Sequence, residues 1–431
     1  MKPATLAFSL LLLGLAGCGG YSARLTRTRT ALDAGAPRQA LRELNRELKV
    51  KRAEDLPAPL KGEGVLLALE RGTVLQQLGR YPLSSRDLEA ADKGIEMLDF
   101  SRSGIHEVGR YLFSDDVGPY RAPAYEKLMI NTLNMVNYLA RGDLSGARVE
   151  ARRFAVMQRF LRDHEEQGVA LSGAGSHLAG FAFERSGQND EALRFYREAA
   201  QYRETPSLRD AIERLSGKKQ AQGPCAQTEN CGELLVVFSL GRVPPKRARR
   251  MPIGLALTYA SPFLSPYDYR RANRIAAQGL VTWVNSPELG MPRGSYESPW
   301  LALNGQALAS EEALQVDVEA RRAWERIRGP VIASALVRTI SRALIGEASR
   351  QAAGGGWAGL LLSLGSQAAL TARDTPDTRS WSTLPARIYL SRLRLPPGDY
   401  VLEGAARGLR GRRRVHLEAG GWALVSFSAL R

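Results

Sequence analysis

Histidine and carboxylate side chains are the groups most often used for catalysis, and few of them fall into recognisable patterns here. The four histidines lie in unrelated sequence contexts: His106, His164, His177 and His416. His106 shares a polar segment with Asp115 and Asp116, which we interpret as a loop, the alternative being a metal or acid–base site. Ser176 directly precedes His177, and adjacent residues of a helix point apart, so the two form no nucleophile–base pair.

The sequence contains no known metal-ligand, phosphate-binding or nucleophile motif. We therefore expect a protein that is not an enzyme, with no catalytic residues, metal or cofactor. The alternative is an enzyme acting on cell-wall glycan, because glycan hydrolysis needs two carboxyl groups and Asp115, Asp116 or Asp377 would supply them.

Cys18 follows an apolar run and is the residue with the clearest chemical role. One positive charge, Lys2, precedes apolar residues from Ala4 to Ala16, a run shorter than the ~20 residues that span a bilayer. Leu15-Ala16-Gly17-Cys18 resembles a lipobox, which implies a signal peptide over residues 1–17 and lipid on Cys18, with acyl chains such as palmitate. Gly19, where an Asp would retain the protein in the inner membrane, implies sorting to the outer membrane.

Two further cysteines, Cys225 and Cys231, flank five residues of a polar, glycine-rich and proline-containing stretch. In an oxidising periplasm this spacing predicts a small disulfide loop. A metal or redox pair is the alternative, but the spacing is not C-x-x-C and no histidine is nearby.

Positive charge dominates the composition, with a formal net charge of +16 carried mostly by arginine. Such a charge favours polyanions, which for an exported protein are lipopolysaccharide, anionic lipid or cell-wall polymer rather than nucleic acid. Two clusters flank strands of the C-terminal half, and we hypothesise that they converge into one anion-binding patch, solvated turns being the alternative. The candidate residues are Arg247, Arg249, Arg250, Arg412, Arg413 and Arg414.

The N-terminal half, residues 18–216, contains four segments with helix-hairpin spacing of apolar and small residues. Their turn glycines are Gly35, Gly79, Gly142 and Gly187. The pattern resembles an irregular tetratricopeptide (TPR) array, which implies a concave groove that binds a protein. Candidate groove residues, with ordinary solvated helix faces as the alternative, are Asn131, Asn134, Asn137, Arg148, Arg152 and Arg153.

The C-terminal half, residues 217–431, has mainly strand patterns. We predict strands at 233–238, 251–257, 280–284, 386–390, 398–404, 413–417 and 422–427, with long loops elsewhere between 261 and 299. A helical insert at about 308–372 is expected, with helical periodicity from Glu311 to Ile345, a break at Gly329-Pro330 and a core helix from Trp357 to Ala372. The expected class is α+β: an irregular TPR-like α-solenoid followed by a small sandwich or sheet.

Two motifs together resemble a family of uncharacterised bacterial lipoproteins with TPR-like helices and a β-rich C-terminal part. One runs from Tyr125 to Arg153, and the other joins Asp377-Thr378-Arg379-Ser380-Trp381 to Leu395-Pro396-Pro397-Gly398. The resemblance implies architecture and location but no activity. We expect an outer-membrane lipoprotein that faces the periplasm and acts as a protein-binding scaffold or regulator. A subunit of an envelope export complex is a further alternative.

Overall fold

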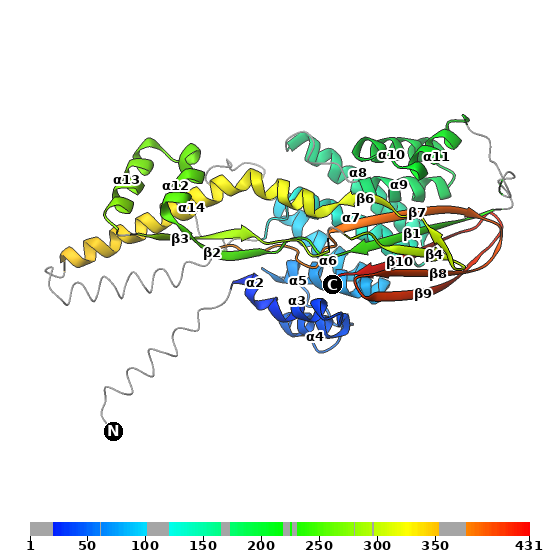
Figure 1. Ribbon diagram of the computed structural model, residues 1–431, viewed down its shortest axis with the longest axis horizontal. Helices are drawn as coiled ribbons and strands as arrows, with labels where there is room; N and C mark the ends of the chain where they lie inside the picture. Colours follow the sequence, from blue (N-terminus) through cyan, green and yellow to red (C-terminus); the bar gives the residue numbers. More distant parts are fainter. Residues whose placement is uncertain are drawn as a thin grey trace, which may run out of the picture.

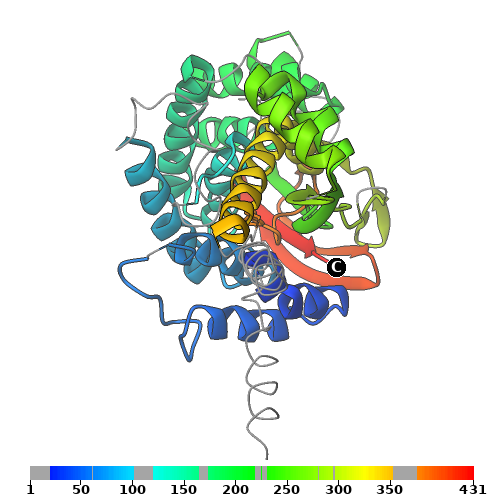
Figure 2. The same cartoon turned by 90° about the vertical axis from the view of Figure 1, so that its left-hand side faces the viewer.

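The computed structural model describes residues 20–60, 62–100, 120–164, 173–218, 225, 231–279, 281–294, 297–352 and 376–431. These residues form a body of helices and sheets from which one arm projects (Figure 1). Figure 2 looks along the arm and shows the helices of the body curving around one side of the strands. The α+β class is therefore as expected.

Helical hairpins build the first half of the body. After the short α2 (Tyr21–Arg24) they are α3 (Thr26–Asp33) with α4 (Pro37–Glu47), α5 (Gly64–Gln77) with α6 (Tyr81–Phe100), α7 (Ala124–Leu139) with α8 (Leu144–His164), and α9 (Gly173–Arg185) with α10 (Asn189–Tyr202); α11 (Pro206–Leu215) follows.

Each hairpin turns at one of the predicted glycines, and all four have a positive φ, from 72° to 74°. After α5, for example, Gly79 N–H donates to Gln76 O and Arg80 N–H to Leu75 O, both at 2.9 Å. This paired capping closes the helix end and requires a left-handed residue, which favours glycine.

Glycines also let the paired helices approach closely. A Cβ on Gly72 would lie 2.9 Å from Leu88, and one on Gly180 would lie 2.5 Å from the ring of Tyr196. The first helices α5, α7 and α9 are buried almost on all sides, whereas α10 has one buried face. The first helices therefore form an inner layer, since one side meets the second helices and the other meets strands.

Two four-stranded sheets make up the rest of the body. One has the order β10-β1-β7-β6 and the other β5-β4-β8-β9. Their strands are β1 (Gly232–Leu240), β4 (Trp300–Leu303), β5 (Gln306–Leu308), β6 (Glu311–Gln315), β7 (Arg387–Leu395), β8 (Gly398–Ala406), β9 (Leu409–Leu417) and β10 (Trp422–Ala429). The predicted strand at 233–238 and the last four are confirmed.

Alternation along β1 shows how the layers meet. Leu235 and Val237 belong to the core shared with the helices, whereas Leu234, Val236 and Phe238 belong to the core between the two sheets. Successive strand residues point to opposite faces, so this strand is buried on both. The hydrophobic core thus crosses the expected domain boundary near residue 217.

Several expectations between 246 and 352 were wrong. The second strand is β2 (Lys246–Pro252), and a helix, α12 (Ile253–Ala260), follows where the strand was predicted to continue. A 3₁₀ turn η4 (Ser261–Phe263) and a helix α13 (Pro266–Ala277) occupy the predicted loops, and β3 spans Trp283–Leu289. Pro252 immediately precedes α12, and Pro266 is the first residue of α13. At these positions a backbone N–H has no partner within the helix, so its absence in proline costs nothing.

The predicted helix at 311–345 begins as strand β6, and α14 (Val316–Ala352) then runs through the expected break at Pro330. The adjacent Gly329 leaves room for the ring of Phe263, since a Cβ there would lie 2.1 Å from it. The predicted helix from Trp357 to Ala372 lies entirely within 353–375, outside the described residues.

The arm consists of the β2–β3 ribbon, α12, η4, α13 and the part of α14 that packs on them (Figure 1). It has its own hydrophobic core, separate from that of the body. The core residues are Met251, Ile253, Ala256, Leu257, Ala260, Ala272, Ile275, Val284, Ile332, Ala333, Ala335, Leu336 and Ile340. Two insertions between strands of the body sheets, residues 246–289 and the part of α14 up to residue 340, therefore meet in one projecting unit.

Candidate functional site

The segment 376–386, which includes part of the second family motif, docks onto the inner helices. Glu70 of α5 accepts hydrogen bonds from Ser382 N–H at 2.8 Å and from Thr383 N–H at 2.7 Å, and the Ser382 hydroxyl adds a third at 2.9 Å. Glu126 of α7 accepts from Trp381 N–H at 3.2 Å. Two buried carboxylates thus satisfy the backbone of an otherwise irregular segment.

Trp381 is the centre of this contact and is fully buried. Its indole N–H donates to the Thr73 hydroxyl at 2.9 Å. Burial is the largest influence on Glu70 and Glu126 and raises the pKa of both, although the hydrogen bonds from the segment oppose it. Two adjacent charged residues, Glu70 and Arg71, inside the apolar run from Val65 to Val74 were the available sequence signal, because buried charges need partners.

A second buried network joins the helices to the sheet through Arg392 of β7. Its guanidinium donates to Glu233 at 2.5 Å, to Glu184 at 2.6 Å and to the Tyr196 hydroxyl at 2.8 Å. Burial alone would raise the pKa of Glu184, but the guanidiniums of Arg392 and Arg214 outweigh it and lower that pKa. The inner helices are therefore fixed to the strands by charge as well as by apolar packing.

The three predicted groove asparagines all lie inside the helical layers. Gln76 donates to the Asn137 side-chain oxygen at 2.8 Å, and Asn137 donates to the Ser84 hydroxyl at 2.9 Å. Asn131 donates to Glu150 at 3.1 Å, and Asn134 is 1% exposed. These side chains connect neighbouring helices, so a partner has no access to them in this conformation.

Of the predicted groove arginines, Arg152 and Arg153 are exposed on α8 and Arg148 is half-buried. Two large apolar side chains on the same helix are also exposed, Val149 by 46% and Val156 by 69%. Residues three, four and seven apart share one face of a helix. Val149, Arg152, Arg153 and Val156, which we call the α8 face, thus form an accessible apolar and basic surface.

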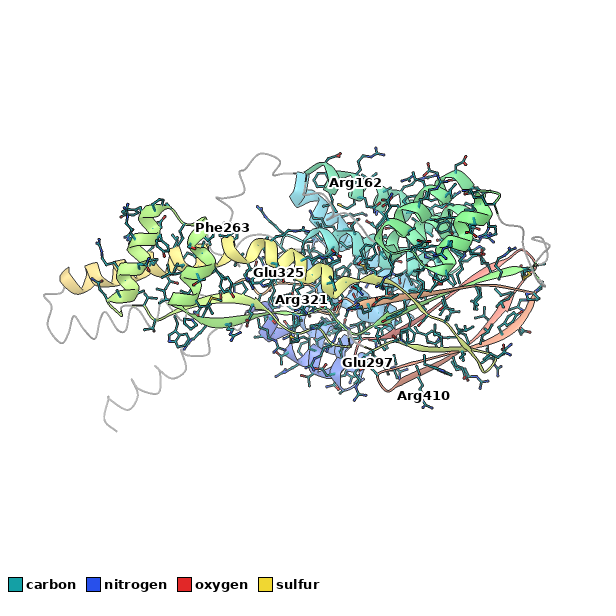
Figure 3. The ribbon with its side chains drawn as sticks, turned by 45° about the horizontal axis from the view of Figure 1, so that its top comes forward. Arg162, Phe263, Glu297, Arg321, Glu325 and Arg410 are labelled. Atoms are coloured by element: carbon teal, nitrogen blue, oxygen red, sulfur yellow. A yellow bond between two sulfur atoms is a disulfide. The ribbon has the colours of Figure 1, made fainter. Side chains whose placement is uncertain are left out.

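The two predicted arginine clusters do not converge. Arg247, Arg249 and Arg250 lie on β2 of the arm, whereas the other three lie on β9, an edge strand of the body: Arg412, Arg413 and Arg414. All six are exposed. Figure 3 shows how far apart the two regions are, with Phe263 marking the arm and Arg410 the edge strand.

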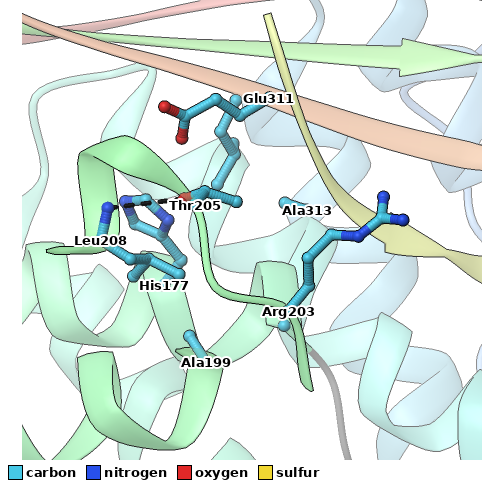
Figure 4. Close-up of a pocket in the computed structure, with 9 residues that line it drawn as sticks. His177, Ala199, Arg203, Thr205, Leu208, Glu311 and Ala313 are labelled. Carbon is cyan, nitrogen blue, oxygen red and sulfur yellow. Dashed lines mark hydrogen bonds between the residues drawn. The ribbon is translucent and has the colours of Figure 1, made fainter. Parts of the chain in front are cut away.

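His177 lies in a tight cleft between α9, α10 and β6 (Figure 4). Thr205, Arg203 and Glu311 also line it, yet the enclosed space is too small for a water molecule. Burial lowers the pKa of His177 to about 3, with the Arg392 guanidinium adding to the effect. The imidazole is neutral at physiological pH, and the cleft cannot admit a substrate as it stands.

The remaining candidate residues of the sequence are dispersed. The sulfurs of Cys225 and Cys231 lie at bonding distance, 2.11 Å. Asp377 forms an ion pair with Arg379 at 2.7 Å, and the exposed His416 contacts Asp399 at 2.9 Å. Cys18 and the residues His106, Asp115 and Asp116 lie outside the described residues.

Across the described ranges, no group of three or more histidine, cysteine, aspartate or glutamate residues is placed to hold a metal ion. Nor does any helix in those ranges combine the length and apolarity that crossing a membrane requires. No protein family, no curated protein and no solved structure matches this chain.

Proposed function

We propose that this protein is a lipid-anchored scaffold of the bacterial outer membrane, facing the periplasm, and that its helical half binds a partner protein through the α8 face. The exposed valines of that face carry the proposal. Apolar side chains scattered singly over a surface are ordinary. Two exposed valines grouped with arginines on one helix face are instead typical of a protein interface.

The first described residues support a membrane anchor close to the body. Tyr21 is 4% exposed, and Ser22 N–H donates to the Thr378 hydroxyl at 3.1 Å. Cys18 precedes Gly20 by two residues, which span at most ~7 Å. Lipid on Cys18 would therefore hold the body directly against the bilayer.

A TPR-like origin of the helices is part of the proposal. Four hairpins share the same glycine cap, and close glycine contacts recur in α5–α6 and α9–α10. Unlike a free-standing array, these helices have strands and the segment 376–386 against their inner side. A partner would thus meet the outer helices rather than a concave groove.

The lipid anchor is tested by feeding cells an alkyne fatty acid and measuring label on the protein. We expect label and membrane fractionation for the full chain and neither for Cys18→Ser. The matched control is the double variant Cys225→Ser/Cys231→Ser, which removes the other two cysteines and keeps the label. Labelled Cys18→Ser protein would refute the anchor.

The α8 face is tested with a photocrosslinking residue at position 156 in living cells. We expect one defined protein adduct, abolished by Val149→Asp in the same chain. The control is a crosslinker at Met291, a residue of the C-terminal half that is 68% exposed. Adducts that are identical at both positions would show that the α8 face has no specific partner.

A further inference from the structure

The exposed side of α13 combines aromatic and basic residues. Tyr267 is 63% exposed, and Arg270 and Arg274, three and seven residues on, are also exposed. This spacing places the three side chains on one face of the helix. The opposite face buries Ala272 and Ile275 in the core of the arm. We call Tyr267, Arg270 and Arg274 the α13 face.

No carboxylate offsets the α13 face from within the helix. Asp268 is the sole acidic residue of α13, and its carboxylate contacts the Ser265 hydroxyl at 2.6 Å at the helix start. The guanidinium of Arg271 lies 5.7 Å from the ring centroid of Tyr267. The face therefore presents a tyrosine and two cations, groups that suit contact with the headgroups of a membrane rather than insertion below them.

Other apolar and aromatic side chains are also exposed on elements of the arm. Leu255 is 46% exposed, Phe263 52%, Tyr269 40% and Trp283 52%. From 246 to 289 the chain carries seven lysines and arginines against Asp268 and Glu288. Tyrosine and tryptophan favour the headgroup level of a bilayer, and arginines favour lipid phosphates.

The arm begins beside the N-terminal end of the described chain. Helix α2 packs on β2, the first strand of the arm, and Gly20 immediately precedes α2. The views of Figures 1 and 2 agree that α2 lies next to the base of the arm. A lipid on Cys18 would thus bring the base of the arm close to the bilayer.

We propose that the arm lies on the membrane that holds Cys18 and that the α13 face binds anionic phospholipid headgroups. This inference rests on the lipid anchor of the proposed function and adds a second, electrostatic contact. One lipid signal plus a basic surface gives firmer attachment than either alone, because the anchor makes the second contact intramolecular. The attachment would fix the orientation of the body relative to the membrane.

The test uses full-length lipidated protein in vesicles, with a polarity-sensitive fluorophore on Tyr267→Cys. This cysteine is the free thiol to be labelled, since Cys225 and Cys231 are at bonding distance and Cys18 carries the lipid. Flotation of the vesicles first reports the anchor. We expect a blue shift of the label in vesicles containing phosphatidylglycerol and none in pure phosphatidylcholine, with the shift reversed by salt.

The charge contribution is measured with Arg270→Gln/Arg274→Gln in the labelled chain. Each arginine lost should lower the bound-to-free ratio of the arm on the order of five-fold. The matched control, Arg159→Gln/Arg162→Gln, removes the same number of exposed arginines from α8 and leaves the ratio unchanged. Figure 3 shows Arg162 on the body, away from the arm.

A second control places the fluorophore on Val156→Cys of the α8 face, where no shift is expected. Protein that floats without a shift at position 267 would overturn the inference and leave the anchor intact. Equal shifts at 156 and 267, or equal shifts with both lipids, would also overturn it. A shift at 267 that appears when periplasmic protein is added in detergent, and never on vesicles, would show that the arm binds protein and would also overturn the inference. Failure to float would refute the anchor itself.

Discussion

Buried charged side chains in this protein form ion pairs and hydrogen bonds with other buried groups. Arg71 and Asp87 are both inaccessible and form a two-point ion pair, with nitrogen–oxygen distances of 2.5 and 3.1 Å. Asn45 accepts a further hydrogen bond from Arg71 at 3.1 Å. Burying an ion costs several kcal/mol unless such bonds satisfy it, so these groups tolerate little change around them.

His177 is buried as a neutral side chain, and its Nε2 is among the buried atoms of the described residues that have no hydrogen-bond partner. Its pKa falls from 6.5 to about 3 on folding, so protonation favours the unfolded chain. The free energy of unfolding therefore keeps its full value above pH 6.5 and decreases as the pH falls toward 3, because the unfolded chain takes up the proton first. Glu70 and Glu126 act in the opposite sense, since their raised pKa makes the folded chain bind protons more tightly.

We therefore predict that His177→Gln reduces acid sensitivity. Between about pH 7 and about pH 5 the unfolding free energy of the wild type should lose about 2 kcal/mol through this histidine, and the variant should lose that much less. Urea denaturation at the two pH values measures the difference. His416→Gln, which changes an exposed histidine, is the control and should behave as wild type; equal pH dependence in all three chains would contradict the prediction.

At the scale of elements, the segment 376–386 decides what the inner helices can do. It fills the side of α5 and α7 that a TPR-like array would offer to a peptide, and its backbone N–H groups use the carboxylates of Glu70 and Glu126. The asparagines of α7 are used in the same way by neighbouring helices. Asn131 and Asn137, which resemble recognition residues in sequence, thus already form hydrogen bonds within the chain.

We predict that Glu70→Gln weakens this docking by about 1–3 kcal/mol, since the amide would set an N–H donor against a donor of the segment and leave it unsatisfied. Thermal unfolding should show a lower midpoint, and limited proteolysis should cut faster near residue 380. Glu204→Gln removes an exposed carboxylate that pairs with Arg209 and is the control. An unchanged midpoint in Glu70→Gln would show that the carboxylate contributes nothing to docking.

At the scale of the whole molecule, separate cores predict that the arm can loosen while the body stays folded. The arm core is made of α12, α13, β2, β3 and α14, and the connection to the body is mainly the continuous α14 and the β2–β3 ribbon. Small units with their own core open locally at lower free energy than the global transition.

Leu336→Ala tests this independence, because Leu336 is fully buried in the arm core. Loss of the side chain should cost about 2–5 kcal/mol of arm stability. Hydrogen exchange measured by mass spectrometry should rise in α12, α13 and the ribbon but not in α5 to α10. Leu402→Ala, in the core between the sheets, should raise exchange in the body and leave exchange in the arm unchanged. Exchange that rises throughout the chain for Leu336→Ala would show one cooperative unit.

Local patterns in the sequence were sufficient for the hairpin turns and the last four strands. A glycine after an apolar helix face and the short Pro-Gly and Gly-Gly turns act through backbone sterics, which neighbouring residues determine. The same kind of reasoning failed at α12 and α13. The apolar run of α12 is compatible with strand or helix until its packing partners are known. The segment of α13 is mainly polar and buries only Ala272 and Ile275, so its sequence predicts a loop.

The sequence by itself determined the α+β class, the four glycine-capped turns and the strand that is buried on both faces. Only the tertiary structure decided that the segment 376–386 covers α5 and α7, that both insertions meet in one arm, and that the asparagines of α7 point inward. These features depend on pairs such as Glu70 with Thr383, which lie 313 positions apart. The physical reason is that hydrogen-bond satisfaction is settled by which groups the fold brings together, and distant partners leave no local pattern.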